Sequence, residues 1–174
     1  MGIDALDARL LRLLTAEPRI GVLEASRRLS VARGTVQARL ERLQARGVVT
    51  SFAPEVDPAA LGYGVTAFAM LEIRQGARDA VTDHLARIPE VIEVHTITGQ
   101  ADLLCRLVAR DNADLQRVID ELVADAEITH TSTFVALSTV VPPRVLPLVD
   151  AAAARDGGRW RDPRAGGPDE QRRG

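Results

Sequence analysis

The spacing of apolar residues changes part-way along this chain. They recur every three to four positions through the first fifty residues and every second position from about Tyr63 onward. The first period indicates helices with one buried face, and the second indicates strands. We therefore predict an α+β protein with a helical domain at residues 1–50, a linker at 51–63 and a second domain at 64–141. A C-terminal extension covers residues 142–174.

Three helices are expected in the first domain, at residues 4–16, 21–29 and 33–46. Pro18 closes the first helix, and Gly47 is the expected stop signal of the third. Three helices with joints this short predict a trihelical (winged) helix-turn-helix, whose third helix is the one that enters the DNA major groove.

The second domain predicts elements in the order βαββαβ. The strands are expected at residues 65–73, 91–98, 102–109 and 129–137, and the helices at 77–88 and 112–126. This order gives a ferredoxin-like sandwich, in which both helices cover one face of a four-stranded antiparallel sheet. Alternation places a second apolar set on the open face, made of Phe68, Met70, Ile92, Val94, Leu104 and Val108. A homodimer formed through this face would remove it from water.

The extension from residue 151 onward is rich in Ala, Gly, Pro and charged residues. Such a segment has little apolar surface to bury, so we expect disorder from about residue 151.

Charge is unevenly distributed along the chain. Residues 1–52 carry a net charge of +4, residues 53–150 carry −8 and residues 151–174 carry +2. The basic first third is the part suited to a polyanion such as double-stranded DNA. The chain has no apolar run long enough to span a membrane, and its N-terminus carries acids where a signal peptide carries bases. We therefore expect a cytoplasmic protein.

The sequence contains no recognisable combination of residues for a catalytic or metal-binding site. The single cysteine, Cys105, lies in an apolar run, and the three histidines, His84, His95 and His130, have no recognisable partners. The sequence has no Gly-rich phosphate loop, no metal-spaced acids and no nucleophile motif. We expect no catalytic residues, no metal and no cofactor.

Polar residues of the third helix lie beside its apolar stripe and are candidates to contact DNA. Arginine can bond guanine through two hydrogen bonds and glutamine can do so with adenine, so Arg33, Gln37 and Arg39 are the expected base readers. Arg42 and Arg46 lie further along the helix and suit phosphates. With two arginines of the second helix, the candidate set is Arg27, Arg28, Arg33, Gly34, Thr35, Gln37, Ala38, Arg39, Arg42 and Arg46.

Four segments together resemble the leucine-responsive/asparagine (Lrp/AsnC) family of feast-or-famine regulators. They are LDARLLRLLTAEPRI, VARGTVQARLERLQARGVV, PEVDPAALGY and HTITGQADLLCRLVAR, and the resemblance covers about residues 3–141. It implies a DNA-binding domain joined to an oligomerising domain that binds a small-molecule effector, usually an amino acid. It also implies homodimers that can assemble further into octamers. The chain departs from the family in having Ala32, a poor helix cap, before the recognition helix.

The resemblance places the effector site at the turn between the second and third strands. Here that turn is Thr98, Gly99, Gln100, Ala101 and Asp102. Backbone N–H groups exposed at a glycine turn can hold a carboxylate, and Asp102 can accept from an ammonium group, so the turn suits a zwitterion. A Gly-x-x-Asp turn is also an ordinary hairpin connection, and this alternative stays open.

Two other functions stay open beside a ligand-modulated regulator of an imperfect palindromic operator. One is an architectural protein that wraps DNA with little sequence or ligand specificity. The other is a metabolite-sensing module whose helix-turn-helix contacts proteins, which the absence of any DNA retention at low salt would support.

Overall fold

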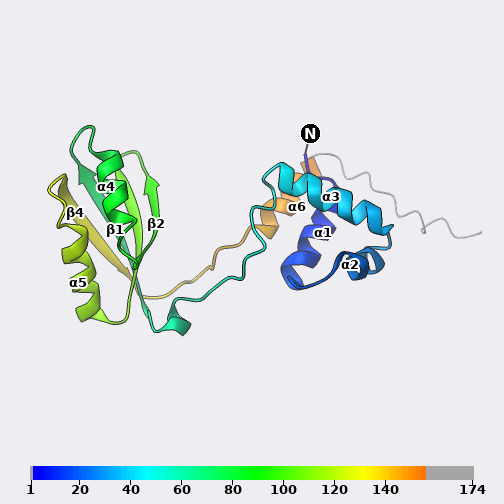
Figure 1. Cartoon of the computed structure of the whole chain (residues 1–174), viewed down its shortest axis with the longest axis horizontal. Helices are drawn as coiled ribbons and strands as arrows, with labels where there is room; N and C mark the ends of the chain where they lie inside the picture. Colours follow the sequence, from blue (N-terminus) through cyan, green and yellow to red (C-terminus); the bar gives the residue numbers. More distant parts are fainter. Residues whose placement is uncertain (1, 156–174) are drawn as a thin grey trace, which may run out of the picture. The chain divides into compact units, whose positions relative to one another are not determined.

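The computed structural model describes residues 2–155, which divide into two compact units (Figure 1). Of the described residues, the helical unit contains those up to Ala53 together with those from Pro142 to Arg155. The sheet unit contains Pro54–Val141.

The helical unit begins with three helices, α1 (Ala5–Ala16), α2 (Val22–Leu29) and α3 (Arg33–Ala45). Their bounds lie within one residue of those expected, because each has a clear apolar face and a nearby start or stop signal. Asp4 and Asp7 form a capping box, in which each side chain accepts a hydrogen bond from the backbone N–H of the other. The buried core shared by the helices consists of Leu6, Leu10, Leu11, Ala25, Leu29, Val36 and Leu43.

A fourth helix, α6 (Leu146–Arg155), belongs to the same unit. It corrects the expectation of disorder from about residue 151, because residues 151–155 complete this helix. Val149 packs against the core of the helical unit, and Ala153 is buried. The segment has little apolar surface of its own, but packing against α1 buries enough of it to stabilise the helix. The rest of the predicted disordered segment, residues 156–174, lies outside the described residues.

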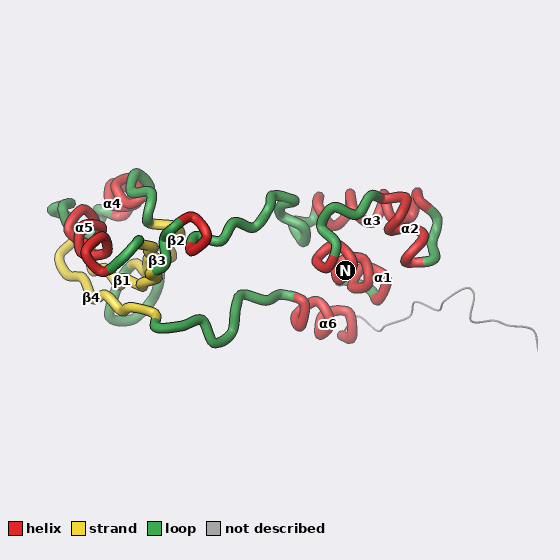
Figure 2. The backbone as a smooth tube through the Cα atoms, turned by 90° about the horizontal axis from the view of Figure 1, so that it is seen from below, coloured by secondary structure: helices red, strands yellow, loops and turns green. Residues whose placement is uncertain are grey.

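The sheet unit follows the predicted order of strands and helices. It contains η1 (Ala59–Leu61), β1 (Val65–Ile73), α4 (Arg78–Leu85), β2 (Val91–Thr96), β3 (Leu103–Ala109), α5 (Asn112–Leu122) and β4 (Ile128–Ala136). The strands form one antiparallel sheet in the order β2-β3-β1-β4. Both helices lie on one face of it (Figure 2). The ferredoxin-like prediction is confirmed.

The sheet core lies between the strands and these two helices. Alternate residues of β1 and β3 face it, and α4 and α5 supply the opposing side chains. Its largest fully buried members are Leu71, Leu85, Ile88, Leu103, Leu107 and Leu122, with Val81 and Val118. The polar groups of the backbone are satisfied by the strand ladders, so this layer is both apolar and hydrogen-bonded.

The open face of the sheet differs from the predicted set at two residues, Val94 and Phe134. A register shift between Val91 and Glu93 makes Val94 pair with Cys105, so Val94 packs against the core instead of lying on the open face. The extra residue of a bulge inverts the alternation that follows it, which a strict period of two cannot anticipate. The open face also gains Phe134, which lies directly opposite Phe68 across β1 and β4. These two rings are 55% and 36% exposed in the single chain.

Candidate nucleic-acid interface and ligand loop

Helix α3 is held to the helical unit by one side and presents the other to solvent. Val36 and Leu43 are fully buried on the attached side. On the other side, the first turns expose Arg33, Gly34, Gln37 and Ala38, while Thr35 is half-buried. The structure therefore gathers five of the predicted DNA contacts at the N-terminal half of one helix, which is the part of a recognition helix that reaches base edges.

The start of α3 has the weak cap that its sequence indicates. Ala32 occupies the N-cap position, and its methyl group offers no oxygen to the free N–H groups of the first turn. Ser30, the nearest hydroxyl, instead ends α2 in a left-handed conformation with φ +57°. The N–H of Thr35 bonds the Ala32 carbonyl oxygen at 3.0 Å, so Arg33 and Gly34 are the residues whose N–H groups suit an acceptor such as a phosphate.

Arg33 and Gln37 differ in how they are held. The Gln37 side-chain amide donates to Glu41 Oε1 at 2.7 Å, one helical turn later. Within the described part of the chain, Arg33 has no ion-pair partner. Its guanidinium can therefore donate directly to an acceptor outside the protein, whereas Gln37 must first break its hydrogen bond to Glu41.

Arg39 and Arg42 have a different environment from the one expected. Arg39 Nη1 lies 2.7 Å from Asp4 Oδ1 and 2.9 Å from Asp7 Oδ1. Arg42 Nη2 lies 2.8 and 2.7 Å from the two oxygens of Asp7. Both arginines thus face the start of α1, where they tie the third helix to the first. In the absence of DNA, both arginines are therefore engaged by acidic side chains of α1, and their predicted contacts with a base and a phosphate stay predictions.

The electrostatics of this cluster favour its charged form. Asp4 is partly buried, which raises its pKa, but hydrogen bonds from Arg39 and from backbone N–H groups lower the pKa below its ordinary value overall. Burial opposes the charge of Arg39, and its bonds to Asp4 and Asp7 more than compensate, so its pKa is raised. The cluster is therefore a fixed part of the helical unit.

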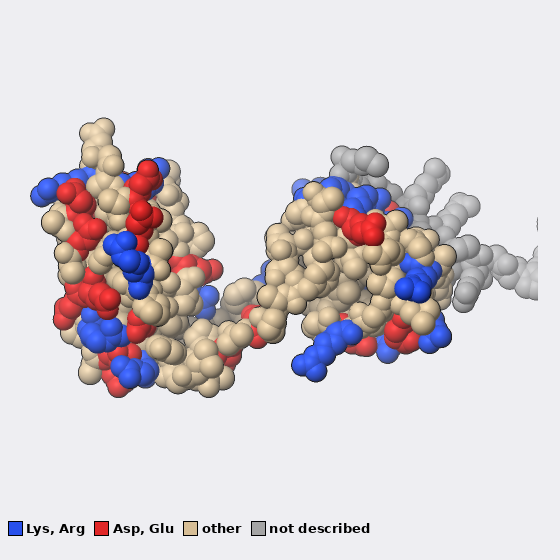
Figure 3. Space-filling view, in the orientation of Figure 1, with Lys and Arg blue, Asp and Glu red and all other residues tan. Residues whose placement is uncertain are grey.

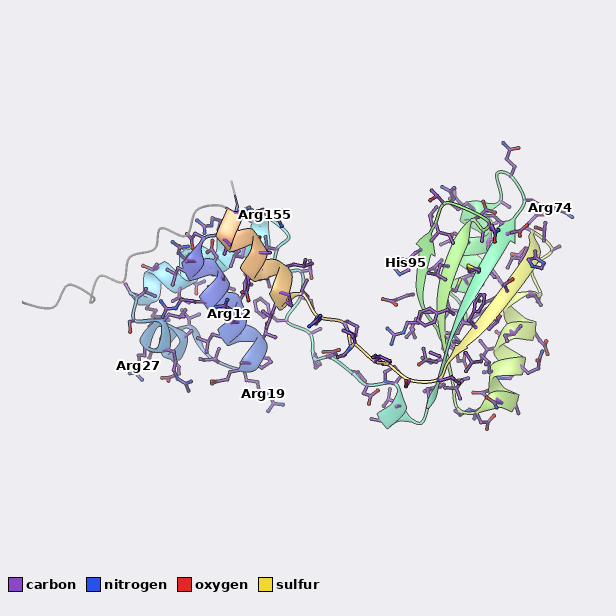
Figure 4. All side chains as sticks on the ribbon, turned by 180° about the vertical axis from the view of Figure 1, so that it is seen from behind. Arg12, Arg19, Arg27, Arg74, His95 and Arg155 are labelled. Atoms are coloured by element: carbon purple, nitrogen blue, oxygen red, sulfur yellow. The ribbon has the colours of Figure 1, made fainter. Side chains whose placement is uncertain are left out.

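The remaining candidate arginines lie at the surface of the helical unit. Arg28 bonds Glu24 at 3.1 Å and Glu17 at 2.9 Å, which raises its pKa. Arg27 lies 3.6 Å from Glu24 with most of its side chain exposed (Figure 4). Arg46 donates to the carbonyl oxygen of Gly2 at 3.1 Å. Basic and acidic side chains lie intermixed on the faces shown in Figure 3, so positive charge is local and does not form a broad band there.

The predicted ligand turn connects β2 to β3. Gly99 has φ +122°, a conformation that favours glycine, and Thr98, Gly99 and Gln100 are exposed. Ala101 and Asp102 are half-buried. The backbone of Asp102 bonds Ile97 and Leu71, each at 2.9 Å, so the turn is anchored at its end.

The Asp102 carboxylate has a structural partner. Its Oδ2 accepts a hydrogen bond from the backbone N–H of Ile73 at 2.9 Å, which joins the turn to the end of β1. A carboxylate can accept at both oxygens, so this bond does not exhaust its capacity. Asp102 can therefore support the turn and still receive an ammonium group.

The described residues contain no group of three or more potential ligands that could hold a metal ion. In the same part of the chain, no helix is long and apolar enough to cross a lipid bilayer. Half-buried His84 bonds the backbone carbonyl of Glu121 at 3.0 Å, which explains it as a packing residue. Cys105 is a free, buried thiol of the sheet core.

Sequence comparison relates each unit to a known domain. Residues 3–50 match the winged helix-turn-helix DNA-binding domain, and residues 66–146 match the Lrp/AsnC ligand-binding domain. An uncharacterised HTH-type transcriptional regulator of Pyrococcus abyssi is 34% identical over 137 residues, which make up 78% of this chain and 87% of that protein.

Solved structures give the same relationship. AsnC of E. coli superimposes with a TM-score of 0.75 at 27% identity, covering 83% of this chain and 99% of that one. A transcriptional regulator of Neisseria meningitidis, solved in complex with L-methionine, also has a TM-score of 0.75, at 25% identity and 83% and 96% coverage. The Pyrococcus and Neisseria proteins are both named transcriptional regulators. With both domains matched in order, this chain belongs to the Lrp/AsnC family of transcriptional regulators.

Proposed function

We propose that this regulator binds an imperfect palindromic DNA operator in a sequence-specific manner, and that an amino acid changes its affinity for that operator. One observation carries the first part. The N-terminal half of α3 exposes Arg33 and Gln37 while Val36 and Leu43 fix the opposite side of the same helix in the core. A rigidly held helix with exposed guanine- and adenine-bonding side chains suits base recognition in the major groove.

The other candidate residues have supporting roles in this proposal. Gly34, Thr35 and Ala38 are small, so they allow close approach of the backbone and suit contact with sugars or thymine methyl groups. Arg27, Arg28 and Arg46 meet phosphates at the edge of the groove. Arg39 and Arg42 act indirectly, because their bonds to α1 hold the recognition helix in place.

A homodimer through the open face of the sheet unit would present two recognition helices to one duplex. Phe68, Phe134 and Ile92 are exposed large apolar side chains of this unit in the single chain. Their removal from water supplies the driving force for pairing, and a two-fold dimer reads two related half-sites. Further assembly, such as an octamer, would bring the ligand turns of several dimers together.

The amino-acid effector is proposed for the turn Thr98, Gly99, Gln100, Ala101 and Asp102. Exposed backbone N–H groups near Gly99 suit a carboxylate, and Asp102 suits an ammonium group. The bond from Asp102 to Ile73 gives a physical route by which the ligand affects the sheet. The related Neisseria protein binds L-methionine, which supports an amino acid as the class of ligand.

An architectural protein that wraps DNA without sequence preference is less well supported. Wrapping requires an extended basic surface, since nonspecific binding depends on phosphate neutralisation. In the helical unit, Arg39 and Arg42 are both paired with acidic side chains of the same unit. This pairing leaves discrete basic positions, which suit a local contact.

The experiment is a comparison of variants on a duplex selected by the wild-type protein from a random-sequence pool. Arg33→Ala and Gln37→Ala should each lose about 1–3 kcal/mol of discrimination between that duplex and its base-substituted forms. Arg46→Ala is the matched control, and should weaken all duplexes alike and reduce the salt slope by about 0.9. Unchanged footprints in Arg33→Ala and Gln37→Ala would remove these residues as base readers. If the wild-type protein bound no duplex even at low salt, the proposed DNA-binding function would be wrong.

A further inference from the structure

Helix α6 completes the helical unit from the other end of the chain. Figures 1 and 4 show it lying along α1. Val149 packs against the helical core, and Ala153 is only 8% exposed. The side chain of Asp150 forms an ion pair with Arg12 of α1. Apolar and charged contacts therefore both hold α6 on α1.

The sequence of α6 accounts for its formation at this place. Pro147 is in the first turn, where a missing N–H is tolerated, and four alanines at residues 151–154 have the highest helix propensity. Leu146, Val149 and Ala153 are three and four residues apart, so they share one face. A helix of ten residues is marginal alone, and its contact with α1 supplies the missing stability.

Almost the whole of α6 lies beyond the regions that match the family. The ligand-binding model ends at residue 146, where α6 begins. Neither matched domain therefore explains this helix.

Because α6 belongs to the helical unit, the two units are connected by two segments of the chain. The chain leaves the helical unit at Ala53, forms the sheet unit and returns at Pro142. The sheet unit is thus inserted between two parts of the helical unit, and two connectors join them. A single flexible connector permits many separations of two domains, while a second one excludes those that it cannot span.

We propose that α6 is a latch, seated on α1 of its own chain, which restricts the half-site separations that a dimer of this regulator can bind. This inference rests on the proposed DNA-binding dimer. With the latch seated, each recognition helix has a narrow range of positions, so affinity depends strongly on the distance between half-sites. With the latch released, the single remaining connector tolerates many distances.

The test compares Ala153→Glu with Ala154→Glu. Both place the same charge near the end of the same helix, but Ala153 is buried and Ala154 is exposed. Hydrogen exchange of the full-length protein, without DNA or ligand, should show loss of protection in α6 for Ala153→Glu and wild-type protection for Ala154→Glu. Equal protection of α6 in both variants would overturn the proposed seat on α1.

The functional step uses the selected duplex and a second duplex with about half a helical turn inserted between its half-sites. Wild type and Ala154→Glu should lose about 100-fold in affinity on the second duplex, since only one half-site is engaged. Ala153→Glu should lose less than about tenfold. Equal losses in all three proteins would overturn the latch, whereas failure of the wild type to bind either duplex would overturn the DNA-binding function instead.

A second variant covers the case in which Ala153→Glu unfolds the helical unit. Asp150→Arg places two arginines opposite each other at a partly exposed position and should also relax the spacing requirement. The double variant Arg12→Asp/Asp150→Arg restores opposite charges and should recover the wild-type requirement. Absence of this recovery, with α6 protected from exchange in the double variant, would also overturn the proposal.

Discussion

Arg42 of the recognition helix bonds Asp7 of the first helix at 2.7 Å, and the Asp7 side chain is completely buried. Arg39 bonds the same carboxylate from the previous turn of α3. The carboxylate thus receives two guanidinium groups in a place that water does not reach. This arrangement fixes the rotation of α3 about its axis and hence which of its side chains face outward.

Replacing Asp7 should destabilise the helical unit. Asp7→Asn removes the one negative charge that Arg39 and Arg42 share, and the loss of hydrogen bonds between charged groups costs about 1–3 kcal/mol. Urea denaturation monitored by circular dichroism measures the change. Glu41→Gln, at an exposed position of α3, is the control and should change the free energy of unfolding by less than about 0.5 kcal/mol. Equal effects would show that the Asp7 cluster contributes no special stability.

The ligand turn predicts a separation of ligand response from DNA binding. Asp102→Ala should abolish the rise in melting temperature produced by an amino acid that stabilises the wild type, because the ammonium acceptor is lost. Basal affinity for DNA should be retained. Thermal-shift measurements with L-methionine and the other proteinogenic amino acids provide the data. Since Asp102 also bonds Ile73, the variant's own melting temperature without ligand is the control for folding. An undiminished response would exclude Asp102 from the site.

Asp114 in α5 predicts an acid dependence of the sheet unit. Hydrogen bonds from the Arg110 side chain and backbone, with a further bond from Arg117, hold the pKa of Asp114 well below its ordinary value. A lowered folded-state pKa stabilises the fold above the unfolded-state value of about 3.9 and loses that contribution as pH falls toward the folded-state value. Asp114→Asn should therefore be less stable than wild type at neutral pH, and the difference should shrink below about pH 4.

Chemical denaturation at several pH values tests this dependence. Asp83→Asn, which changes an exposed carboxylate of α4, is the comparison variant and should follow the wild-type profile. A gap between Asp114→Asn and wild type that stays constant to the lowest pH would contradict the assignment of this carboxylate.

Cys105 should be unreactive in the folded protein. Burial raises the pKa of its thiol to about 11, so the nucleophilic thiolate is scarce at about pH 8, and β1 and β2 flank it in the sheet. A colorimetric disulfide reagent should label it only after urea is added. Rapid labelling without urea would indicate that the sheet opens readily at β3.

Most of the fold could be predicted from local patterns. The two apolar periods gave the element order, and the capping and stop residues placed the first three helices within one residue of their observed bounds. Val94 was placed on the wrong face because a bulge depends on how two strands pair, which the spacing within one strand does not contain.

The ion pairs of the recognition helix and the helix at the C-terminus were not predictable from the sequence, for related reasons. The apolar stripe of α3 identifies its attached side, but the charges that α1 brings to Arg39 and Arg42 depend on how the helices pack. Similarly, α6 carries a visible signal in its alanine run and in the spacing of Leu146, Val149 and Ala153. Its partner surface lies more than a hundred residues earlier in the chain, so a reading of the tail alone underestimates what it can bury.

The return of the chain to α1 has a consequence for biosynthesis. A ribosome synthesises every strand of the sheet unit before it reaches Val149 and Ala153. During that time the apolar surface of the nascent helical unit that α6 covers stays exposed. A truncated mRNA that ends after the family-matched region would yield a protein with both domains, but its helical unit would lack α6.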